Sequence, residues 1–509
     1  MSGAAPASLL IRTARGAGWV IGFRMLTRLL GMVSTLILVR LLDPGDFGLI
    51  ALATSFTGTI DALSNLSVHE AIIRERAPDR SMYDTAFTMN LIRGVLTTLL
   101  IAATAQPVAT FFREPRLVPV MLVLAVANLV GALESIATAN FMRDFAFDRE
   151  FRLWSIPRLL QVAAAVGFAA LFHSYWALAF GIMTGRLTRT ALSYVMAPFR
   201  PRLTLAAWRR ITGFTGWSWA IMLVQAFGGR IDTAVVGRLF TPAQVGVYGV
   251  GGEIATLPTG ELVAPLCRAC FPAFSELRNT GQGVAATFLR LLGATTLMVL
   301  PAGVGIAAVA DPLVKLAFGE RWTAAIPMIQ ILGVAGTLGV VSNLSGTLLS
   351  AFGMLRTIFA VTLGAMLLRL ALLTGFAPGG SLAVVAWLVT VATAVEQAAY
   401  LVLTAQHFGV GMGAMLRTVH RSLLGTAAMA GGLLWLGLGF VAVADRFALH
   451  LAEQVAAGAA LYAAAMLGIW TLAGQPDGPE RDLLGVVAPT VARIGGTLAR
   501  MAGRLSRVP

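Results

Sequence analysis

Long apolar stretches separated by short polar segments run along the whole chain of 509 residues. Each stretch has about 18 residues or more, enough for an α-helix to cross roughly 30 Å of hydrocarbon. Charged residues, prolines and glycines mark their ends, where helices stop and turns begin. The pattern predicts fourteen membrane-spanning helices, at residues 17–41, 47–72, 84–106, 117–141, 153–172, 175–197, 211–239, 243–271, 285–310, 322–351, 355–376, 381–405, 418–443 and 451–473.

The composition supports this prediction. Hydrophobic residues make up 57% of the chain and charged residues only 12%, whereas a typical soluble domain has about 25% charged residues. The mean hydropathy is +0.80. Because every segment between the apolar stretches is short, no large soluble domain fits. The expected fold class is therefore an all-α membrane protein.

Arginines cluster in alternate loops, after the second, fourth and sixth predicted spans, and again in the C-terminal tail. Loops rich in arginine stay on the cytoplasmic side of a membrane. This distribution predicts a multi-pass protein of the inner (cytoplasmic) membrane with both termini in the cytoplasm. It also accounts for the net charge of +14 through attraction to anionic lipid, so no nucleic-acid partner is expected.

A turn sequence occurs twice. Residues 40–48 read RLLDPGDFG and residues 238–246 read RLFTPAQVG, an offset of 198 positions. In both copies a proline follows one predicted span and a glycine lies at the start of the next. A weaker echo pairs residues 112–114 (FRE) with residues 318–320 (FGE). Since the offset equals six spans, the two halves have the same orientation, as in transporters built from two parallel lobes.

These two turns, together with FGERW at residues 318–322, resemble the polysaccharide transporter family of the multidrug/oligosaccharidyl-lipid/polysaccharide exporter superfamily. The resemblance spans the whole chain. It implies two pseudo-symmetric six-helix lobes in a V around a central cavity, plus two extra C-terminal helices. It also implies a flippase that moves undecaprenyl-diphosphate-linked oligosaccharide repeat units by alternating access, for exopolysaccharide, O-antigen or capsule. The implied partners are that lipid-linked glycan, membrane lipids, and a polysaccharide polymerase with its export machinery.

The repeat divides the chain into four expected parts. Residues 1–207 form an N-terminal lobe, 208–410 a C-terminal lobe, 411–474 two further helices, and 475–509 a cytoplasmic tail. In the tail, apolar residues recur at alternating spacings of three and four, with arginines between them. This spacing after Pro489 predicts a basic amphipathic helix on the inner leaflet.

A flippase moves a polar, anionic headgroup through hydrocarbon, so charged residues inside the spans are the informative ones. Arg24 and Arg28 lie four residues apart on one face of the first span, and Arg28 lies too close to Arg40 for the intervening chain to cross the bilayer. These two arginines, with Arg230 and Arg268, are expected to bind diphosphate or an acidic sugar in the cavity. Ion pairs inside the N-terminal lobe are the structural alternative.

The second span carries a polar stripe that includes Asp61 and Asn65. Asp61 is expected either to pair with an arginine of the first span or to titrate as a coupling site for H+ or Na+, with pairing favoured. The seventh and eighth spans, equivalent by the repeat, add Asp232, Glu253 and Glu261 as candidates for ion coupling or cavity pairing. Other charges in or near spans are secondary candidates, expected to form pairs within the lobes: Arg93, Glu134, Arg186, Arg369 and Glu396.

The chain lacks the sequence motifs of the common enzyme sites, such as HExxH, GxSxG or a Walker loop. Cys267 and Cys270 have the spacing of a redox CxxC pair, but they lie at the end of an apolar helix and are expected to be structural. The chain is therefore expected to be a transporter and not an enzyme, with no cofactor or metal, driven by a proton or sodium gradient.

Two other transporter functions remain open. A lipid II flippase also has fourteen spans and a cationic cavity, and it is the main alternative. A multidrug cation antiporter of the same superfamily usually has twelve spans and an acidic cavity. The extra spans and the arginines inside the spans favour an anionic, lipid-linked substrate.

Overall fold

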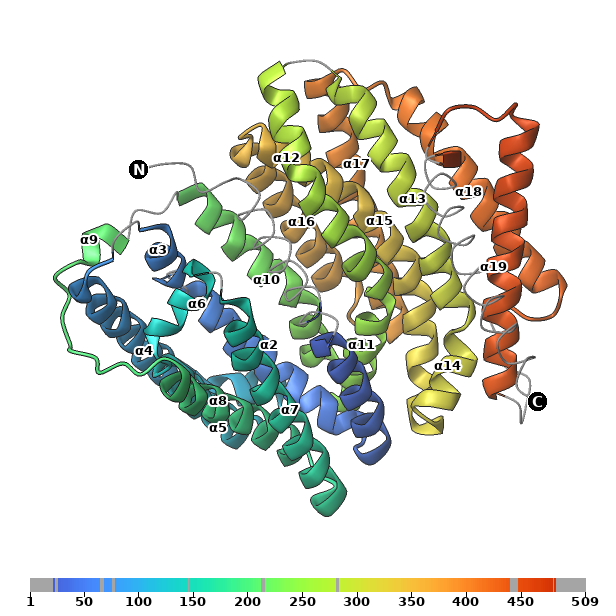
Figure 1. Cartoon of the computed structure of the whole chain (residues 1–509). Helices are drawn as coiled ribbons and strands as arrows, with labels where there is room; N and C mark the ends of the chain where they lie inside the picture. The colour runs from blue at the N-terminus through green and yellow to red at the C-terminus, as the bar shows by residue number, and fades with distance from the viewer. Residues whose placement is uncertain are drawn as a thin grey trace, which may run out of the picture. The chain divides into compact units, whose positions relative to one another are not determined.

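The computed structural model describes residues 22, 26–64, 68–75, 78–144, 146–211, 216–280, 283–439, 447–478 and 480–481. Within these ranges the chain folds into helices joined by short connections (Figure 1). Among the described residues, nine helices are long and apolar enough to cross a membrane, or ten if one bent pair is a single span. The expected fold class is confirmed, while the count of fourteen spans stays a prediction.

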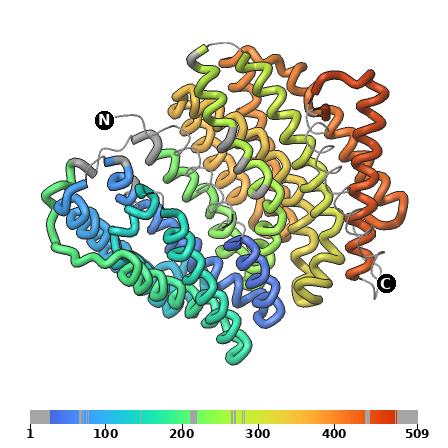
Figure 2. The backbone as a smooth tube through the Cα atoms, in the orientation of Figure 1, coloured from blue at the N-terminus to red at the C-terminus, as the bar shows by residue number. Residues whose placement is uncertain are grey.

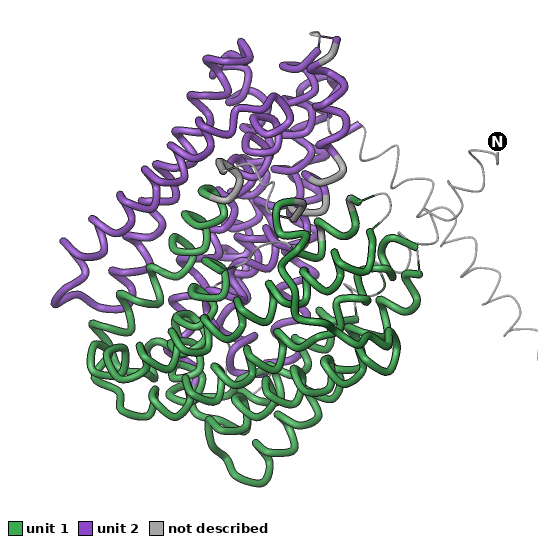
Figure 3. Tube along the Cα trace, turned by 90° about the vertical axis from the view of Figure 1, so that its left-hand side faces the viewer, with its two compact units in different colours: residues 1–249, 317–321 green, residues 250–316, 322–509 purple. Residues whose placement is uncertain are grey.

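The chain forms two compact units, which Figure 3 shows in different colours. Unit 1 comprises residues 1–249 and 317–321, and unit 2 comprises residues 250–316 and 322–509. The four parts expected from the repeat, with a lobe boundary at residue 207, stay a prediction.

Unit 1 contains a helix over residues 26–41 and the first half of the labelled helices. These are α2 (Pro44–Ser64), α3 (Val68–Arg74), α4 (Arg80–Phe112), α5 (Leu117–Ala132), η1 (Ile136–Thr138), α6 (Ala139–Arg143), α7 (Phe147–Phe172), α8 (Trp176–Met196), α9 (Trp208–Ile211), α10 (Gly216–Leu239) and the start of α11 (Pro242–Ala255). Figure 2 traces the same backbone by residue number.

Unit 2 begins within α11 and contains the remaining helices. These are η2 (Thr259–Val263), α12 (Ala264–Thr280), α13 (Val284–Ala308), α14 (Ala310–Ala317, whose last residue is grouped with unit 1), η3 (Glu320–Ala325), α15 (Ile326–Ala351), α16 (Leu355–Phe376), α17 (Leu382–Phe408), α18 (Met412–Trp435) and α19 (Phe447–Leu472).

Both copies of the repeated turn begin a helix by the same device. In the first turn, the Asp46 carboxylate accepts a hydrogen bond from the backbone N–H of Asp43. In the second, the Gln244 side chain accepts one from the backbone N–H of Thr241, whose hydroxyl in turn accepts one from the backbone N–H of Gln244. In the second turn this reciprocal arrangement is a capping box, and in the first turn one of its two bonds is recorded. Both turns have proline at the first helical position. The repeat therefore encodes two equivalent helix starts, α2 and α11.

Two predicted spans are interrupted within the described residues. The span expected at 117–141 bends by 62° between α5 and the η1–α6 segment. The span expected at 243–271 consists of α11, the π-helix η2 and α12, with the break next to Pro258, as a proline kink requires. The span expected at 47–72 covers α2 and α3, and residues 65–67 between them lie outside the described residues. Hydropathy detects apolar length but not the breaks, because a kink changes direction without changing composition.

Large apolar side chains cover much of the described surface. In α16 and in α19, only 11% of the most apolar stretch of 18 residues is buried inside the protein. Leu472, at the end of α19, is 90% exposed. Such faces suit a hydrocarbon solvent, in which an exposed apolar side chain has no cost. The helices are thus apolar on the outside as well as in their packed interior.

Candidate functional site

The best connected of the predicted cationic residues is Arg230, in the middle of α10. Its Nη1 donates hydrogen bonds to the carbonyl oxygens of Thr54 and Ser55 in α2, at 2.8 and 2.7 Å. Gly58 leaves room for this guanidinium, because a Cβ there would lie 2.5 Å from Nη1. Arg230 therefore joins α10 to α2 inside unit 1. Its role in binding a headgroup stays a prediction.

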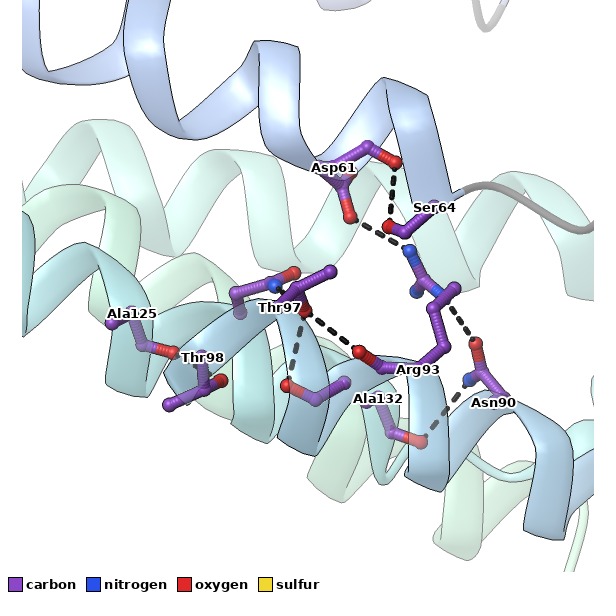
Figure 4. Close-up of polar contacts among 10 residues, drawn as sticks. Asp61, Ser64, Asn90, Arg93, Thr97, Thr98, Ala125 and Ala132 are labelled. Atoms are coloured by element: carbon purple, nitrogen blue, oxygen red, sulfur yellow. Dashed lines mark hydrogen bonds and ion pairs between the residues drawn. The ribbon is translucent and has the colours of Figure 1, made fainter. Parts of the chain in front are cut away.

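Asp61 forms an ion pair, with Arg93 of the third predicted span rather than with an arginine of the first. Arg93 Nη1 lies 2.7 Å from Asp61 Oδ1, and the two side chains are 16% and 42% exposed. Arg93 Nε donates to Asn90 Oδ1 at 3.2 Å. Figure 4 shows this chain of contacts between α2 and α4. The guanidinium is held from two sides, so its position is fixed by the fold.

Helix α5 completes the support of this pair. Asn90 Nδ2 donates to the carbonyl oxygen of Ala132 at 3.1 Å (Figure 4), which is one of the orphan carbonyls at the C-terminus of α5. A Cβ at Gly94 would lie 2.1 Å from the Ala132 Cβ, so only glycine lets α4 and α5 pack this closely. Asn128 Nδ2 donates to Thr97 Oγ1 at 2.7 Å. Polar contacts thus link α2, α4 and α5 within an apolar bundle.

A second charged pair lies at the bend after α5. Arg189 Nε on α8 lies 3.0 Å from Glu134 Oε2, an ion pair without the angle of a hydrogen bond. The Arg189 guanidinium carbon is 3.5 Å from the centroid of the Trp154 ring, a close cation–π contact. Glu134 Oε1 and Glu150 Oε2 are buried and have no hydrogen-bond partner within the described part of the chain. Acceptors that lack partners here are free to bind a donor from a ligand.

These groups line one cavity of about 320 Å³ in unit 1. Three arginines and three acids face it, so the ionised groups balance: Arg93, Arg186, Arg189, Asp61, Glu134 and Glu150. Asn90, Asn128, His69 and Trp154 add amide, imidazole and indole groups. Paired donors and acceptors beside an aromatic ring suit a ligand rich in hydroxyl groups, since each hydroxyl both donates and accepts.

The sequence predicts that Arg93 and Glu134 form pairs within a lobe, and both are paired inside unit 1, with Asp61 and Arg189. The sequence analysis does not single out Arg189 or Glu150. One signal was available: Arg186 and Arg189 are three residues apart on the apolar helix α8, which places two cations on one face. The partner acids lie on other helices, and no spacing in the sequence identifies them.

The other predicted site residues do not gather at this cavity. Arg28 is exposed on the helix 26–41, and Glu253 is exposed on α11. Asp232 accepts a hydrogen bond from the Tyr248 hydroxyl at 3.3 Å. Arg24 and Asn65 lie outside the described residues, as does nearly all of the predicted amphipathic tail; Glu261 and Arg268 lie in the described helices η2 and α12, but their side chains are outside the described part.

Cys267 and Cys270 are both free and buried in a hydrophobic cluster of unit 2 with Phe274, Phe288 and Leu344. Within the part of the chain that the structure describes, no charged side chain of the kind that activates a catalytic cysteine is recorded beside either thiol. The prediction that they are structural fits this position.

The two copies of the repeated turn contact each other inside unit 1. A Cβ on Gly48 would lie 1.7 Å from the Pro242 carbonyl oxygen, and a Cβ on Gly246 would lie 1.9 Å from the Pro44 carbonyl oxygen. Each glycine thus touches the proline of the other copy, in a reciprocal contact like that of a two-fold interface. Because backbone meets backbone, no other residue fits at either position.

The FGERW segment joins the first turn. Arg40 Nε donates to the Ala317 carbonyl oxygen at 3.0 Å, and Arg321 Nη1 lies 2.9 Å from Asp43 Oδ1. Arg321 and Asp43 are 71% and 67% exposed, so this ion pair adds little stability, about 0–1 kcal/mol. The three sequence motifs that carry the family resemblance therefore meet at one place in unit 1.

Comparisons with known proteins agree with this arrangement. A family model described as "Polysaccharide biosynthesis protein" matches residues 37–327. The chain is 25% identical over 354 residues to the lipopolysaccharide biosynthesis protein WzxC of Escherichia coli, covering 68% of this chain and 71% of that protein. It is 23% identical over 328 residues to the succinoglycan biosynthesis transport protein ExoT of Rhizobium meliloti, covering 63% and 65%. The structure of the lipid II flippase MurJ in an inward closed conformation matches with a TM-score of 0.70 at 13% identity, over 89% of this chain and 99% of that chain.

Proposed function

Because the chain belongs to the polysaccharide biosynthesis protein family, we propose that it moves undecaprenyl-diphosphate-linked oligosaccharide repeat units across the cytoplasmic membrane, for exopolysaccharide, O-antigen or capsule synthesis. The observation that carries this proposal is the extent of the family match. It spans residues 37–327, which include both repeated turns, the FGERW segment and every residue of the unit 1 cavity. ExoT, a relative, is described as a transport protein.

The physical problem of such transport is the headgroup. Sugars and diphosphate lose their hydration in hydrocarbon, at several kcal/mol for each unsatisfied polar group. A path through the membrane must replace those hydrogen bonds. The cavity of unit 1 supplies arginines, carboxylates and amides inside a bundle of apolar helices, and it is the described feature best suited to that task.

We assign the cavity residues separate roles. Arg93 and Arg189 donate hydrogen bonds to sugar hydroxyl or carboxylate groups, and Glu134 and Glu150 accept them. Trp154 offers an apolar ring face, 40% exposed. Asp61, held by Arg93 but 42% exposed, is the proposed site of coupling to a proton or sodium gradient. Alternating access then exposes the cavity to each side of the membrane in turn.

The lipid II flippase remains the second candidate. The similarity to MurJ is 13% identity, so it supports the fold and not the substrate. Both candidates use a polyprenyl-diphosphate carrier, so the glycan decides between them. For the oligosaccharide flippase, we further propose an inner-membrane location with both termini in the cytoplasm, and a polysaccharide polymerase as a partner.

The test is reconstitution of the purified chain in liposomes that carry a labelled polyprenyl-diphosphate oligosaccharide. Accessibility of the sugar to an external glycosidase measures transfer between leaflets. Faster transfer of the oligosaccharide than of lipid II supports the proposal, and empty liposomes give the background. Transfer of lipid II alone, together with rescue of cells depleted of their lipid II flippase, would establish the alternative.

A further inference from the structure

Arg158 is a cation in the middle of α7, one of the helices long and apolar enough to cross a membrane. At 1.5 Å per residue it lies about 16 Å from Phe147 at the start of the helix and about 21 Å from Phe172 at its end. An arginine side chain does not extend that far, so the guanidinium stays within the depth of the span. Ionised groups at such a depth face protein or a water-filled space, because hydrocarbon does not solvate them.

The half-buried Arg158 side chain forms no hydrogen bond or ion pair with the residues that the structure describes. By contrast, Arg93 is paired with Asp61, and Arg189 is paired with Glu134. An ionised group inside a span is costly unless an opposite charge or a hydrogen-bond partner accompanies it. Arg158 therefore suits an anion that a ligand brings.

Arg158 lies on the face of α7 that lines the unit 1 cavity. Glu150 and Trp154 belong to the cavity lining, and Arg158 follows them at the same spacing of four residues, which places all three on one face of the helix. One turn separates Arg158 from Trp154, about 6 Å along the helix axis. The cation thus comes directly after the residues proposed to contact sugar.

The guanidinium group lies against helix 26–41. A Cβ added to Gly31 would be 3.4 Å from Arg158 Nη2, so the glycine brings the backbone of that helix close to the cation. Seven residues further along each helix, Leu38 and Ala165 belong to one hydrophobic cluster. Since seven residues make about two turns, the two helices pack along the faces that carry Gly31 and Arg158.

Near this contact the surface of both helices is apolar. Large apolar side chains at least 38% exposed lie within five residues of Gly31 on helix 26–41 and within two residues of Arg158 on α7: Met32, Val33, Leu36, Ile156, Leu159 and Leu160. Such side chains suit hydrocarbon or a lipid tail. Arg158 is therefore a cation that follows cavity residues along α7 and has exposed apolar neighbours.

We propose that Arg158 binds the phosphate groups that join the glycan to its lipid carrier, at the place where α7 meets Gly31. A guanidinium binds phosphate oxygens in two-pronged hydrogen bonds. The sugar then occupies the unit 1 cavity, and the polyprenyl tail stays in hydrocarbon beside the exposed apolar side chains. This inference rests on the proposed function, and it assigns a residue to the junction between headgroup and tail.

The test uses the full chain in detergent and native mass spectrometry with three lipids: polyprenyl diphosphate without sugar, the neutral polyprenol, and phosphatidylglycerol. Arg158→Gln removes a charged hydrogen-bond donor, so binding of polyprenyl diphosphate should weaken by roughly tenfold to hundredfold. Binding of polyprenol and of phosphatidylglycerol should not change. Arg152→Gln is the matched control, because Arg152 is an exposed arginine of the same helix that pairs with Asp148, and it should bind all three lipids as the parent chain does.

Melting curves of the ligand-free chain separate binding from a structural role. Since Arg158 has no partner among the described residues, Arg158→Gln should keep or raise the melting temperature. Arg158→Lys keeps the charge but not the two-pronged geometry, and its affinity for polyprenyl diphosphate should lie between those of the parent chain and of Arg158→Gln. A lower melting temperature of Arg158→Gln with unchanged lipid binding would show a structural role and would overturn the proposal.

Two further outcomes would overturn the proposal: unchanged binding of polyprenyl diphosphate by Arg158→Gln, and an equal loss of phosphatidylglycerol binding, which would show a general affinity for anionic lipids. Failure of the proposed function looks different. If the parent chain moves no oligosaccharide in liposomes while Arg158→Gln loses polyprenyl diphosphate, the binding site stands and the function does not. If Arg158→Gln binds and moves the lipid-linked oligosaccharide as the parent chain does, the function stands and the site does not.

Discussion

Helix α4 lines the polar cavity of unit 1, and helix α13 packs in the hydrophobic cluster of unit 2. The sequence repeat relates the two helices, with an offset of 198 at the two turns and of 206 at the FRE and FGE echo. The offset of 198 that relates the two turns also pairs Thr97 and Thr98 with Thr295 and Thr296. In this register Arg93 corresponds to Leu291 and Asn90 to Phe288. Phe288 is fully buried in the cluster of unit 2, and Leu291 packs against it. Where unit 1 has an ion pair and a cavity, unit 2 has a packed apolar core.

The comparison shows that two copies of a repeat can keep the same backbone features and still differ in the polarity of their side chains. Both copies keep the helix start, the side-chain acceptor that caps the backbone N–H before the proline, and the close glycine contact. At the positions compared here, among the described residues, the first copy has an ion pair beside a cavity and the second has apolar side chains, and charged groups are costly inside apolar helices. The proposed function therefore places the binding surface for the headgroup in unit 1.

The largest effect on transport is expected from Arg93→Leu, which gives unit 1 the residue of unit 2. Hydrogen bonds to a charged group contribute about 1.5–3 kcal/mol, so export of the glycan should fall roughly tenfold to hundredfold. Surface polysaccharide is measured in cells that depend on the variant, with the amount of folded protein determined in parallel. Normal export by a folded Arg93→Leu chain would remove the cavity from the transport path.

The next largest effect is expected at the glycine–proline contact that the two copies of the turn share. Gly48→Ala places a methyl group 1.7 Å from the Pro242 carbonyl oxygen, and such overpacking costs about 1–3 kcal/mol. The starts of α2 and α11 must then separate, and export should fall by about tenfold. Gly45→Ala is the matched control, since a Cβ there meets nothing within 4 Å. If both variants export equally, the reciprocal contact is not needed for transport.

A smaller effect on transport is expected at Asn90, which the offset of 198 pairs with Phe288. Asn90→Leu removes a neutral hydrogen bond to the Ala132 carbonyl oxygen, worth about 0.5–1.5 kcal/mol, and one acceptor of the charged Arg93, which keeps its pair with Asp61. Transport should therefore fall two- to tenfold. Phe288→Leu should lower thermal stability, by about 0.5–3 kcal/mol, and leave transport per folded molecule unchanged. Transfer rates and melting curves of both purified variants provide the comparison. The reverse pattern would contradict the placement of the binding surface in unit 1.

The smallest effect is expected from Cys267→Ala with Cys270→Ala. Both thiols are free and buried in the hydrophobic cluster of unit 2, and neither residue lines the cavity of unit 1. Each substitution should cost about 1 kcal/mol or less, as for a small change in core volume, and export should stay normal. In the parent chain neither thiol should react with an aqueous maleimide. Rapid labelling, or loss of export, would assign the pair a role beyond packing.

Much of the fold could be predicted from the sequence, because apolar length and turn residues depend on local sequence alone. The sequence predicts a turn between two spans at each copy of the repeat, with the proline ending one helix and the glycine entering the next, whereas each proline is the first residue of the new helix, α2 or α11. The contact of Gly48 with Pro242, and of Gly246 with Pro44, depends on the packing of the helices and not on local sequence. The residues that meet in the candidate site are harder to predict from the sequence. Asp61 and Arg93 are 32 residues apart, and the arginine was expected from the first span. A sequence gives the charges inside spans, but packing decides which of them meet.

The central claim is that the cavity of unit 1 contacts the glycan during transport, and site-directed labelling tests it most directly. In a chain whose two native cysteines are replaced, Met142→Cys places a thiol on the cavity wall, and Leu160→Cys places one on the exposed apolar face of α7. We expect a charged maleimide to label the Met142→Cys chain, lipid-linked oligosaccharide to slow that reaction severalfold, and the Leu160→Cys chain to show no protection. Identical labelling rates at Met142→Cys with and without the oligosaccharide would contradict the account.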